Sequence, residues 1–209
     1  MRIGIVPKIT EFFKNQYECT VDIKLIDFFK KIFKKSEILI LNQTTNNKRI
    51  DFLILQGGND LVFFNKNMKN IIRQKYNNYY FNLAQKNKIP TLGICLGAQF
   101  IAKKYKATLI NKKHVGKHKI LFSNVKFFKN IKLPSTTNSY HNYVIKKLDK
   151  RFINLAFAQD KSIEAFINFN KKILGIMWHP ERFNKFRKFD KQMIKRFYDI
   201  SNTSSRTRE

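Results

Sequence analysis

The sequence predicts an α/β fold, a three-layer sandwich with a mainly parallel central sheet and added antiparallel strands. Over the first hundred residues, short apolar runs alternate with longer amphipathic stretches, as strands and helices alternate around a parallel sheet. Beyond Asn111, strand-like runs are joined by turns rich in Asn, Lys and Ser, as antiparallel strands commonly are. Helices on both faces of the sheet would form the outer layers.

In the first half, the apolar pattern predicts buried strands at residues 3–6, 37–41, 51–55 and 91–94. It also predicts a helix around residues 25–33, whose apolar side chains share one face. A second helix contains residues 79–84. A third is expected over residues 98–105, directly after the fourth strand.

The second half is expected to add strands at residues 119–128, 153–159, 162–169 and 172–178. A last helix is predicted because Phe189, Met193 and Phe197 recur at helical spacing. A chain of 209 residues fits one compact domain. That domain is expected over residues 1–200, with a polar tail over residues 201–209.

The charge balance is strongly basic, with 42 Lys+Arg against 14 Asp+Glu and a net charge of +28. Such a charge attracts polyanions. The lysines are spread through the chain beside many Asn, Ile and Phe, however, and all of these residues have A/T-rich codons. There is no compact basic block with interleaved aromatic residues. Biased genome composition therefore explains the charge better than a nucleic-acid partner does.

Only two cysteines occur, Cys19 and Cys95, which predicts one reactive thiol rather than a disulfide framework. The first apolar run is interrupted by Pro7 and Lys8 and is too short for a signal-peptide core. No run approaches the ~18 apolar residues of a membrane span. We expect a cytoplasmic protein without a membrane partner.

Cys95 is the candidate nucleophile. It lies between Gly93 and Gly97, where a predicted buried strand meets a predicted helix, which is the context of a nucleophile elbow. Small flanking residues avoid clashes in that turn, and the helix N-terminus favours a thiolate. A buried structural cysteine is the alternative, which the two glycines disfavour. Cys19 has no such setting and is expected to be structural.

Attack of a thiolate on an amide carbon creates an oxyanion, which needs two preorganised N–H donors. The amide of Leu96 is the expected first donor. The second is expected from Gly57-Gly58, because parallel strands bring the loops at their carboxyl ends to one edge of the sheet. Glycine also lets the backbone approach a substrate closely. An ordinary turn is the alternative for this pair.

His179 is the expected base and acid, in the run Met177 to Glu181 after an apolar strand. Pro180 keeps His179 out of the helical region. Glu181 can turn its carboxylate back to the imidazole and fix its orientation. A structural histidine is the alternative wherever no thiol is near. The sequence thus predicts a triad of Cys95, His179 and Glu181.

These motifs, GICLGAQ with QGG upstream and WHPE downstream, resemble those of class I glutamine amidotransferases, and SIEAF and NSYHNY add to the likeness. The resemblance covers most of the chain and implies that family's flavodoxin-like fold. It implies Cys95 as nucleophile, His179 as base and acid, and Glu181 as orienting group. The amides of Gly58 and Leu96 would form the oxyanion hole.

The resemblance also implies a set of substrate-binding residues. Gln99 would hold the glutamyl group, and the backbone of residues 139–141 would contact its amino and carboxylate groups. His141 is expected in the pocket wall, because only His179 has a nearby orienting carboxylate. The full set is Gly57, Asn59, Gln99, Ser139, Tyr140 and His141.

His114 and His118 are four residues apart, the spacing of two metal ligands on a helix. Gly116 and the adjoining strand pattern argue against a helix there. No metal ligand is therefore expected, and the proposed chemistry requires no cofactor.

Within the family, some members pass ammonia to a synthetase and others hydrolyse gamma-glutamyl amides. The chain leaves no room for a synthetase domain, so a synthetase partner would be a separate protein. GGND and HVGKH resemble the hydrolase branch, which favours a small-molecule gamma-glutamyl substrate and release of glutamate. A likeness to hydrolases of bacterial capsule biosynthesis implies a nucleotide-linked substrate. Two alternatives stay open: a basic nucleic-acid-binding protein and a glutaminase subunit.

Overall fold

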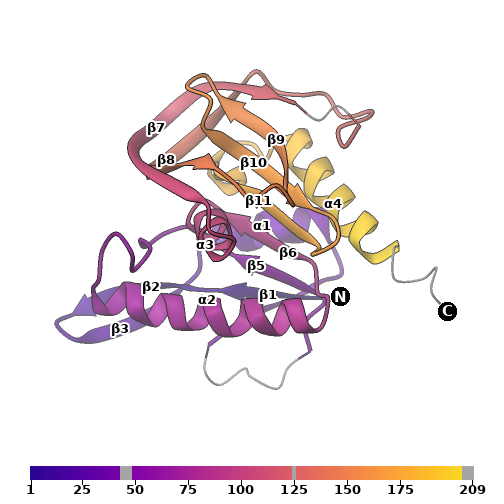
Figure 1. The fold of residues 1–209 in the computed structure, drawn as a ribbon. Coiled ribbons are helices and arrows are strands. Elements are labelled where there is room, and N and C mark those ends of the chain that lie inside the picture. The colour runs from indigo at the N-terminus through magenta and orange to yellow at the C-terminus, as the bar shows by residue number, and fades with distance from the viewer. Residues whose placement is uncertain (43–48, 124–125, 204–209) are drawn as a thin grey trace.

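The computed structural model describes residues 1–42, 49–123 and 126–203 and is drawn in Figure 1. Within these ranges, a nine-stranded sheet has the strand order β4-β1-β5-β6-β11-β10-β8-β7-β9. Its first five strands are β4 (Glu37–Ile40), β1 (Arg2–Val6), β5 (Phe52–Leu55), β6 (Thr91–Ile94) and β11 (Ile173–Ile176). The others are β10 (Ile163–Asn168), β8 (Thr136–Lys147), β7 (Thr108–Phe122) and β9 (Ile153–Ala158).

The sheet has a parallel half and an antiparallel half. β1 pairs in parallel with β4 and β5, β5 with β6, and β6 with β11. The other pairings are antiparallel, and β9 also pairs with β10, so that β10, β8, β7 and β9 close into a ring. The expected α/β class is confirmed. A mainly parallel sheet is not confirmed, because five of the nine strands described in this sheet have antiparallel pairings.

Helices cover both faces of the parallel half (Figure 1). α1 (Ile23–Ile32) and α4 (Lys188–Thr203) pack in one apolar cluster, and α2 (Met68–Lys86) and α3 (Leu96–Lys104) pack in another. Successive strand residues point to opposite faces. In β1, Ile5 accordingly belongs to the first cluster and Val6 to the second.

Two structural elements are absent from the sequence prediction. One is the antiparallel hairpin of β2 (Lys8–Phe13) and β3 (Gln16–Thr20), and the other is β8. Most residues of the hairpin are exposed, and β8 carries many polar residues. Neither segment therefore has the apolar run that identifies a buried strand.

The boundaries in the second half also differ from those expected. The strand predicted at residues 119–128 ends at Phe122, residues 126–130 form a turn, and residues 124–125 lie outside the described residues. α4 continues to Thr203, so the first part of the expected polar tail is helical, and residues 204–209 lie outside the described residues. The division into one domain and a tail stays a prediction.

None of the helices in the described ranges combines the length and the apolar character needed to cross a membrane.

Candidate active site

The candidate catalytic residues follow three strands that are neighbours in the sheet. Gly57 follows β5, Cys95 follows β6 and His179 follows β11, and β6 lies between the other two strands. The three strands are parallel, so their carboxyl ends open at one edge of the sheet. The topology thus brings together residues that lie far apart in the sequence.

Cys95 lies at the corner between β6 and α3, with φ 51° and ψ −105°. This left-handed φ is uncommon for a residue other than glycine. The glycines on either side permit the close approach of α3. A Cβ on Gly93 would meet the Gly97 carbonyl carbon at 2.6 Å, and one on Gly97 would meet the Leu55 oxygen at 1.9 Å. The expected strained turn is therefore present, and the Cys95 side chain is almost fully buried.

His179 and Glu181 form the contact that the sequence predicts. His179 Nδ1 lies 2.6 Å from Glu181 Oε1, and both side chains are buried. His179 has an extended backbone (φ −108°, ψ 95°), and η2 (Pro180–Arg182) begins directly after it. This short turn returns the carboxylate to the ring, which fixes its orientation.

Gly57 packs against both Cys95 and His179. A Cβ at this position would lie 2.5 Å from His179 Cε1 and 3.3 Å from the Cys95 Cβ. Only glycine leaves room for the imidazole there. Gly58 follows with φ +89°, a conformation that favours glycine. The expected approach of the QGG loop is thus found, and the assignment of its amide to an oxyanion hole stays a proposal.

The charge state of His179 follows from its neighbours. Burial lowers the pKa of His179, but the charge and hydrogen bond of Cys95 and the Glu181 carboxylate outweigh it and raise this pKa to about 9. At neutral pH the ring is therefore protonated. A protonated imidazole beside a cysteine can donate a proton to a departing group.

Asn138 on β8 is a site residue that the sequence reasoning missed. Its side-chain oxygen accepts the His179 amide at 2.9 Å, and its side-chain nitrogen donates to the His179 carbonyl at 3.0 Å. The Tyr140 ring, two residues along the strand, lies 5.9 Å from the His179 ring between centroids. One face of β8 thus supports His179.

Arg73 on α2 was also missed, since an arginine in a polar helix gives no sign of burial. The side chain is buried and donates to the carbonyls of Val6, Pro7 and Gln56. It therefore ties the end of β1 to the end of β5, just before the glycine pair.

Two predicted substrate-binding side chains have partners within the protein. The Asn59 amide accepts from the Ile9 N–H and donates to the Ile9 carbonyl, both at 2.8 Å. Gln99 Nε2 donates to the Tyr143 carbonyl at 2.8 Å. Asn59 thus anchors the β2 hairpin and Gln99 connects α3 to β8. Their expected role in binding substrate stays a proposal.

Ser139 and His141 point to the face of β8 opposite Asn138. On that face they lie beside His114, His118 and Glu164. We call His114, His118, His141 and Glu164 the histidine cluster. Burial, together with the other histidines, lowers the pKa of His141 to about 3. The expected role of His141 in the pocket wall stays a proposal.

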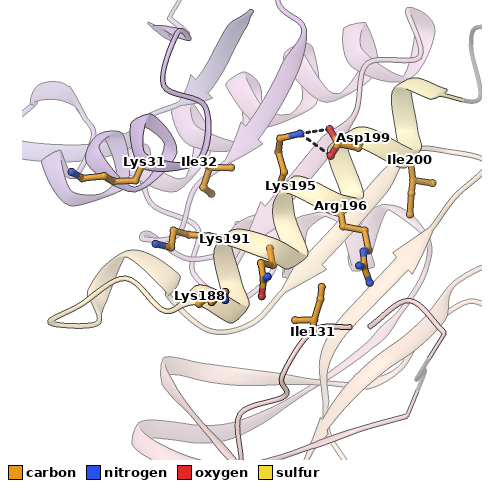
Figure 2. Close-up of a pocket in the computed structure, with 10 residues that line it drawn as sticks. Lys31, Ile32, Ile131, Lys188, Lys191, Lys195, Arg196, Asp199 and Ile200 are labelled. Carbon is orange, nitrogen blue, oxygen red and sulfur yellow. Dashed lines mark hydrogen bonds and ion pairs between the residues drawn. The ribbon is translucent and has the colours of Figure 1, made fainter. Parts of the chain in front are cut away.

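A separate hollow lies along α4, and Figure 2 shows the residues that line it. Lys195 there pairs with Asp199 at 2.6 Å. None of the ten lining residues is aromatic, so the hollow lacks the stacking surface used to bind single-stranded nucleic acid. Five of them are cationic: Lys31, Lys188, Lys191, Lys195 and Arg196.

Comparison with known proteins agrees with this geometry. Residues 14–200 match the model of the family described as Glutamine amidotransferase class-I. A gamma-glutamyl-CDP-amidate hydrolase from Campylobacter jejuni subsp. jejuni is 38% identical over 152 residues, which cover 72% of this chain and 71% of that protein. A glutamine-hydrolyzing GMP synthase subunit from Methanocaldococcus jannaschii is 31% identical over 152 residues, which cover 68% of this chain and 70% of that protein.

Solved structures show the same fold. The crystal structure of a glutamine amidotransferase from Thermotoga maritima matches with a TM-score of 0.66 and 18% sequence identity. The match covers 99% of this chain and 84% of that chain.

Proposed function

The chain belongs to the class I glutamine amidotransferase family, a family of enzymes, and from this premise we propose that it is a cysteine-dependent hydrolase of a gamma-glutamyl amide. Cys95 is the nucleophile, His179 the acid and base, and Glu181 the group that orients His179. One observation carries the proposal: Cys95 and the hydrogen-bonded pair of His179 and Glu181 follow adjacent parallel strands.

The first half of the reaction forms a thioester. The Cys95 thiolate attacks the gamma-carbonyl carbon, and the resulting oxyanion is stabilised by the backbone amides of Leu96 and the Gly57-Gly58 loop. The carbon–nitrogen bond then breaks as the protonated His179 gives its proton to the departing nitrogen. The amine leaves, and a glutamyl thioester remains on Cys95.

The second half regenerates the enzyme. The now neutral His179 removes a proton from water, which attacks the thioester carbonyl. The carbon–sulfur bond breaks, glutamate is released, and the Cys95 thiolate again faces a protonated imidazole. Glu181 stabilises the imidazolium in both halves, and every proton is returned without a cofactor.

The proposed substrate carries a nucleotide on the departing nitrogen. The likeness to the gamma-glutamyl-CDP-amidate hydrolase supports gamma-glutamyl-CDP-amidate, which would give glutamate and cytidine diphosphoramidate. A small-molecule substrate fits a site whose thiol is almost fully buried. Because activated nucleotides are made in the cytoplasm, such a substrate supports a cytoplasmic location.

The GMP synthase relative supports a second candidate, a glutaminase subunit that supplies ammonia to a separate synthetase. The two candidates share the same thioester chemistry and differ in the departing nitrogen. A hydrolase should act alone on the nucleotide-linked amide. A glutaminase subunit should act on glutamine and need its synthetase.

Release of glutamate from a panel of gamma-glutamyl compounds tests the proposal. The panel contains gamma-glutamyl-CDP-amidate, glutamine and a gamma-glutamyl peptide. Wild-type protein should act on the first without a partner, and Cys95→Ser should lower kcat at least about 10³-fold because the nucleophile is lost. Mass spectrometry of quenched wild-type protein should find one glutamyl group on Cys95.

Cys19→Ser is the matched control, because Cys19 is the other cysteine and lies exposed on β3. It should retain wild-type turnover. Unchanged turnover in Cys95→Ser would exclude the mechanism. Turnover of glutamine alone, and only with an added synthetase, would favour the glutaminase subunit.

A further inference from the structure

The histidine cluster has no part in the proposed reaction. His114 and His118 come from β7, His141 from β8 and Glu164 from β10. His141 is paired with His114 across the two strands. The cluster therefore lies inside the ring of antiparallel strands, behind the face of β8 that supports His179.

The expectation of no metal ligand here depended on the absence of a helix. Residues 114–118 are indeed part of a strand. Gly116 has φ +87°, however, and its backbone bend lets the side chains of His114 and His118 converge, with ring centroids 5.4 Å apart. The spacing that suits a helical pair therefore brings two imidazoles together on a bent strand as well.

Three imidazole nitrogens surround one oxygen of Glu164. The distances to Glu164 Oε1 are 3.4 Å from His114 Nδ1, 3.9 Å from His118 Nε2 and 3.9 Å from His141 Nε2. Ligand atoms about 2.0–2.2 Å from a tetrahedral zinc ion lie about 3.3 Å from one another. The donor atoms of His114, His118 and Glu164 all lie within 4.8 Å of one another, so small side-chain rotations would bring them to coordinating distance. His141 must rotate further to become the fourth ligand.

Glu164 is buried beside imidazole rings. Its side chain is 1% exposed, and His114 Nδ1 at 3.4 Å pairs with it only when the ring is protonated. By hydrogen-bond geometry, both Glu164 oxygens lack a well-formed partner among the described residues. A buried carboxylate is costly unless a cation compensates it, and a bound metal ion would do so whether or not His114 is protonated.

The remaining ring nitrogens are oriented as those of metal-binding histidines are. His114 Nε2 lies 3.0 Å from the Asp160 carboxylate, and His118 Nδ1 lies 3.0 Å from the Lys119 carbonyl. If each of these nitrogens donates its proton, the other nitrogen of each ring presents a lone pair to Glu164. The Ser139 hydroxyl contacts His118 Nε2 at 2.9 Å and would rotate away on metal binding.

From this geometry we propose that the histidine cluster binds one zinc ion. Imidazole and carboxylate donors suit zinc. A cavity of about 300 Å³ bordered by His114, His118 and Asp160 gives access from the surface. The ion would hold β7, β8 and β10 together. The proposal does not depend on the proposed reaction. The four ligands are His114, His118, His141 and Glu164.

Zinc titration of the untagged 209-residue chain, first treated with a chelator, tests the site. Competition with a chromophoric chelator should give one equivalent per chain, with a Kd below about 1 μM for a preformed site with four ligands. Added zinc should also raise the midpoint of thermal unfolding. Uptake of less than about 0.1 equivalent at micromolar zinc would overturn the proposal.

Two variants locate the bound ion. Glu164→Gln keeps the volume but removes the anionic ligand, and it should weaken binding by more than about 100-fold. Asp160→Asn leaves all four ligands in place and should weaken it about 10- to 100-fold. Full binding by both variants would exclude the cluster as the site. If Glu164→Gln does not fold, the wild-type titration still shows whether zinc binds, and Asp160→Asn still shows whether it binds at the cluster.

Cys95→Ser is the control that separates this site from the candidate active site, since a thiolate beside an imidazole also attracts zinc. This variant should lose turnover and keep its equivalent of zinc. Loss of zinc binding in Cys95→Ser would place the ion at Cys95 and overturn the proposal.

Discussion

At the scale of single residues, His179 is held by a set of contacts that each constrain a different part of it. Asn138 fixes its backbone through two hydrogen bonds, Glu181 fixes its ring, and Gly57 leaves room for the ring beside Cys95. A catalytic base works only when its orientation is maintained through the reaction. The buried surroundings of His179 provide this orientation.

The pH dependence of kcat/KM should report the protonation of His179. The pKa of this ring is raised to about 9, and the proposed mechanism needs the protonated ring. The value of kcat/KM should therefore fall as pH rises through about 9. Protonation of His179 also stabilises the folded protein. This contribution is complete below about pH 6.5, the pKa of an unperturbed histidine, and is lost as pH rises from there through about 9. Initial rates of glutamate release between about pH 6 and 10 measure this fall, the alkaline limb of the pH profile.

Glu181→Gln provides the comparison. Loss of the carboxylate should move the alkaline limb to lower pH by about one to two units, because a neighbouring negative charge favours the protonated ring. The maximal rate should also fall. A limb that stays in place would show that Glu181 does not set the pKa of His179. Glu11→Gln, on the distant β2 hairpin, should leave the profile unchanged.

The sequence predicted the positions of the candidate catalytic residues better than those of the residues that hold them in place. Cys95 and His179 stand beside glycine or proline at the ends of apolar runs, and this local context marks them. Asn138 and Arg73 are polar residues within polar segments. Their partners are backbone atoms far away in the sequence, so only the folded chain identifies them.

At the scale of helices and strands, the contact between α3 and the parallel strands fixes the position of Cys95. Gly97 lies against the Leu55 backbone on β5, and Gly93 lies against the first turn of α3. The helix therefore approaches the sheet more closely than any residue with a side chain would permit. The left-handed conformation of Cys95 at this junction depends on that approach.

Gly97→Ala should disrupt this contact. The added Cβ would lie 1.9 Å from the Leu55 oxygen, so α3 must move away from β5. We expect the free energy of unfolding to fall by about 3 kcal/mol or more, and kcat to fall about 100-fold through displacement of Cys95. Urea unfolding and glutamate release measure these effects. Lys104→Ala, at the exposed end of α3, should change stability by less than about 0.5 kcal/mol. Wild-type stability in Gly97→Ala would contradict this account.

Several of the strands that the sequence identified are buried on both faces. β1, β5, β6 and β11 have apolar residues at almost every position and read as continuous hydrophobic runs. The β2–β3 hairpin and β8 alternate polar and apolar residues irregularly. The hairpin forms a separate two-stranded sheet, and the ring that β8 helps to close depends on long-range contacts. No local pattern specifies such contacts.

At the scale of the whole molecule, the net charge of +28 is distributed rather than concentrated. The hollow along α4 gathers cationic side chains but has no aromatic lining. The rim of the cavity at the histidine cluster carries Lys112, Lys113 and Lys119. Cations at several places raise the general attraction for anions, and this includes a nucleotide-linked substrate.

Binding to a labelled single-stranded oligonucleotide, followed by fluorescence anisotropy, distinguishes general attraction from a nucleic-acid-binding function. We expect a Kd of about 10⁻⁴–10⁻⁶ M at physiological salt, weakening steeply between about 50 and 200 mM salt, because only phosphate contacts would contribute. Cys95→Ser should bind equally, since the candidate active site takes no part. Submicromolar binding that persists at about 200 mM salt would instead require base contacts. The basic surface would then be a functional interface, and the nucleic-acid alternative would replace the compositional explanation of the charge.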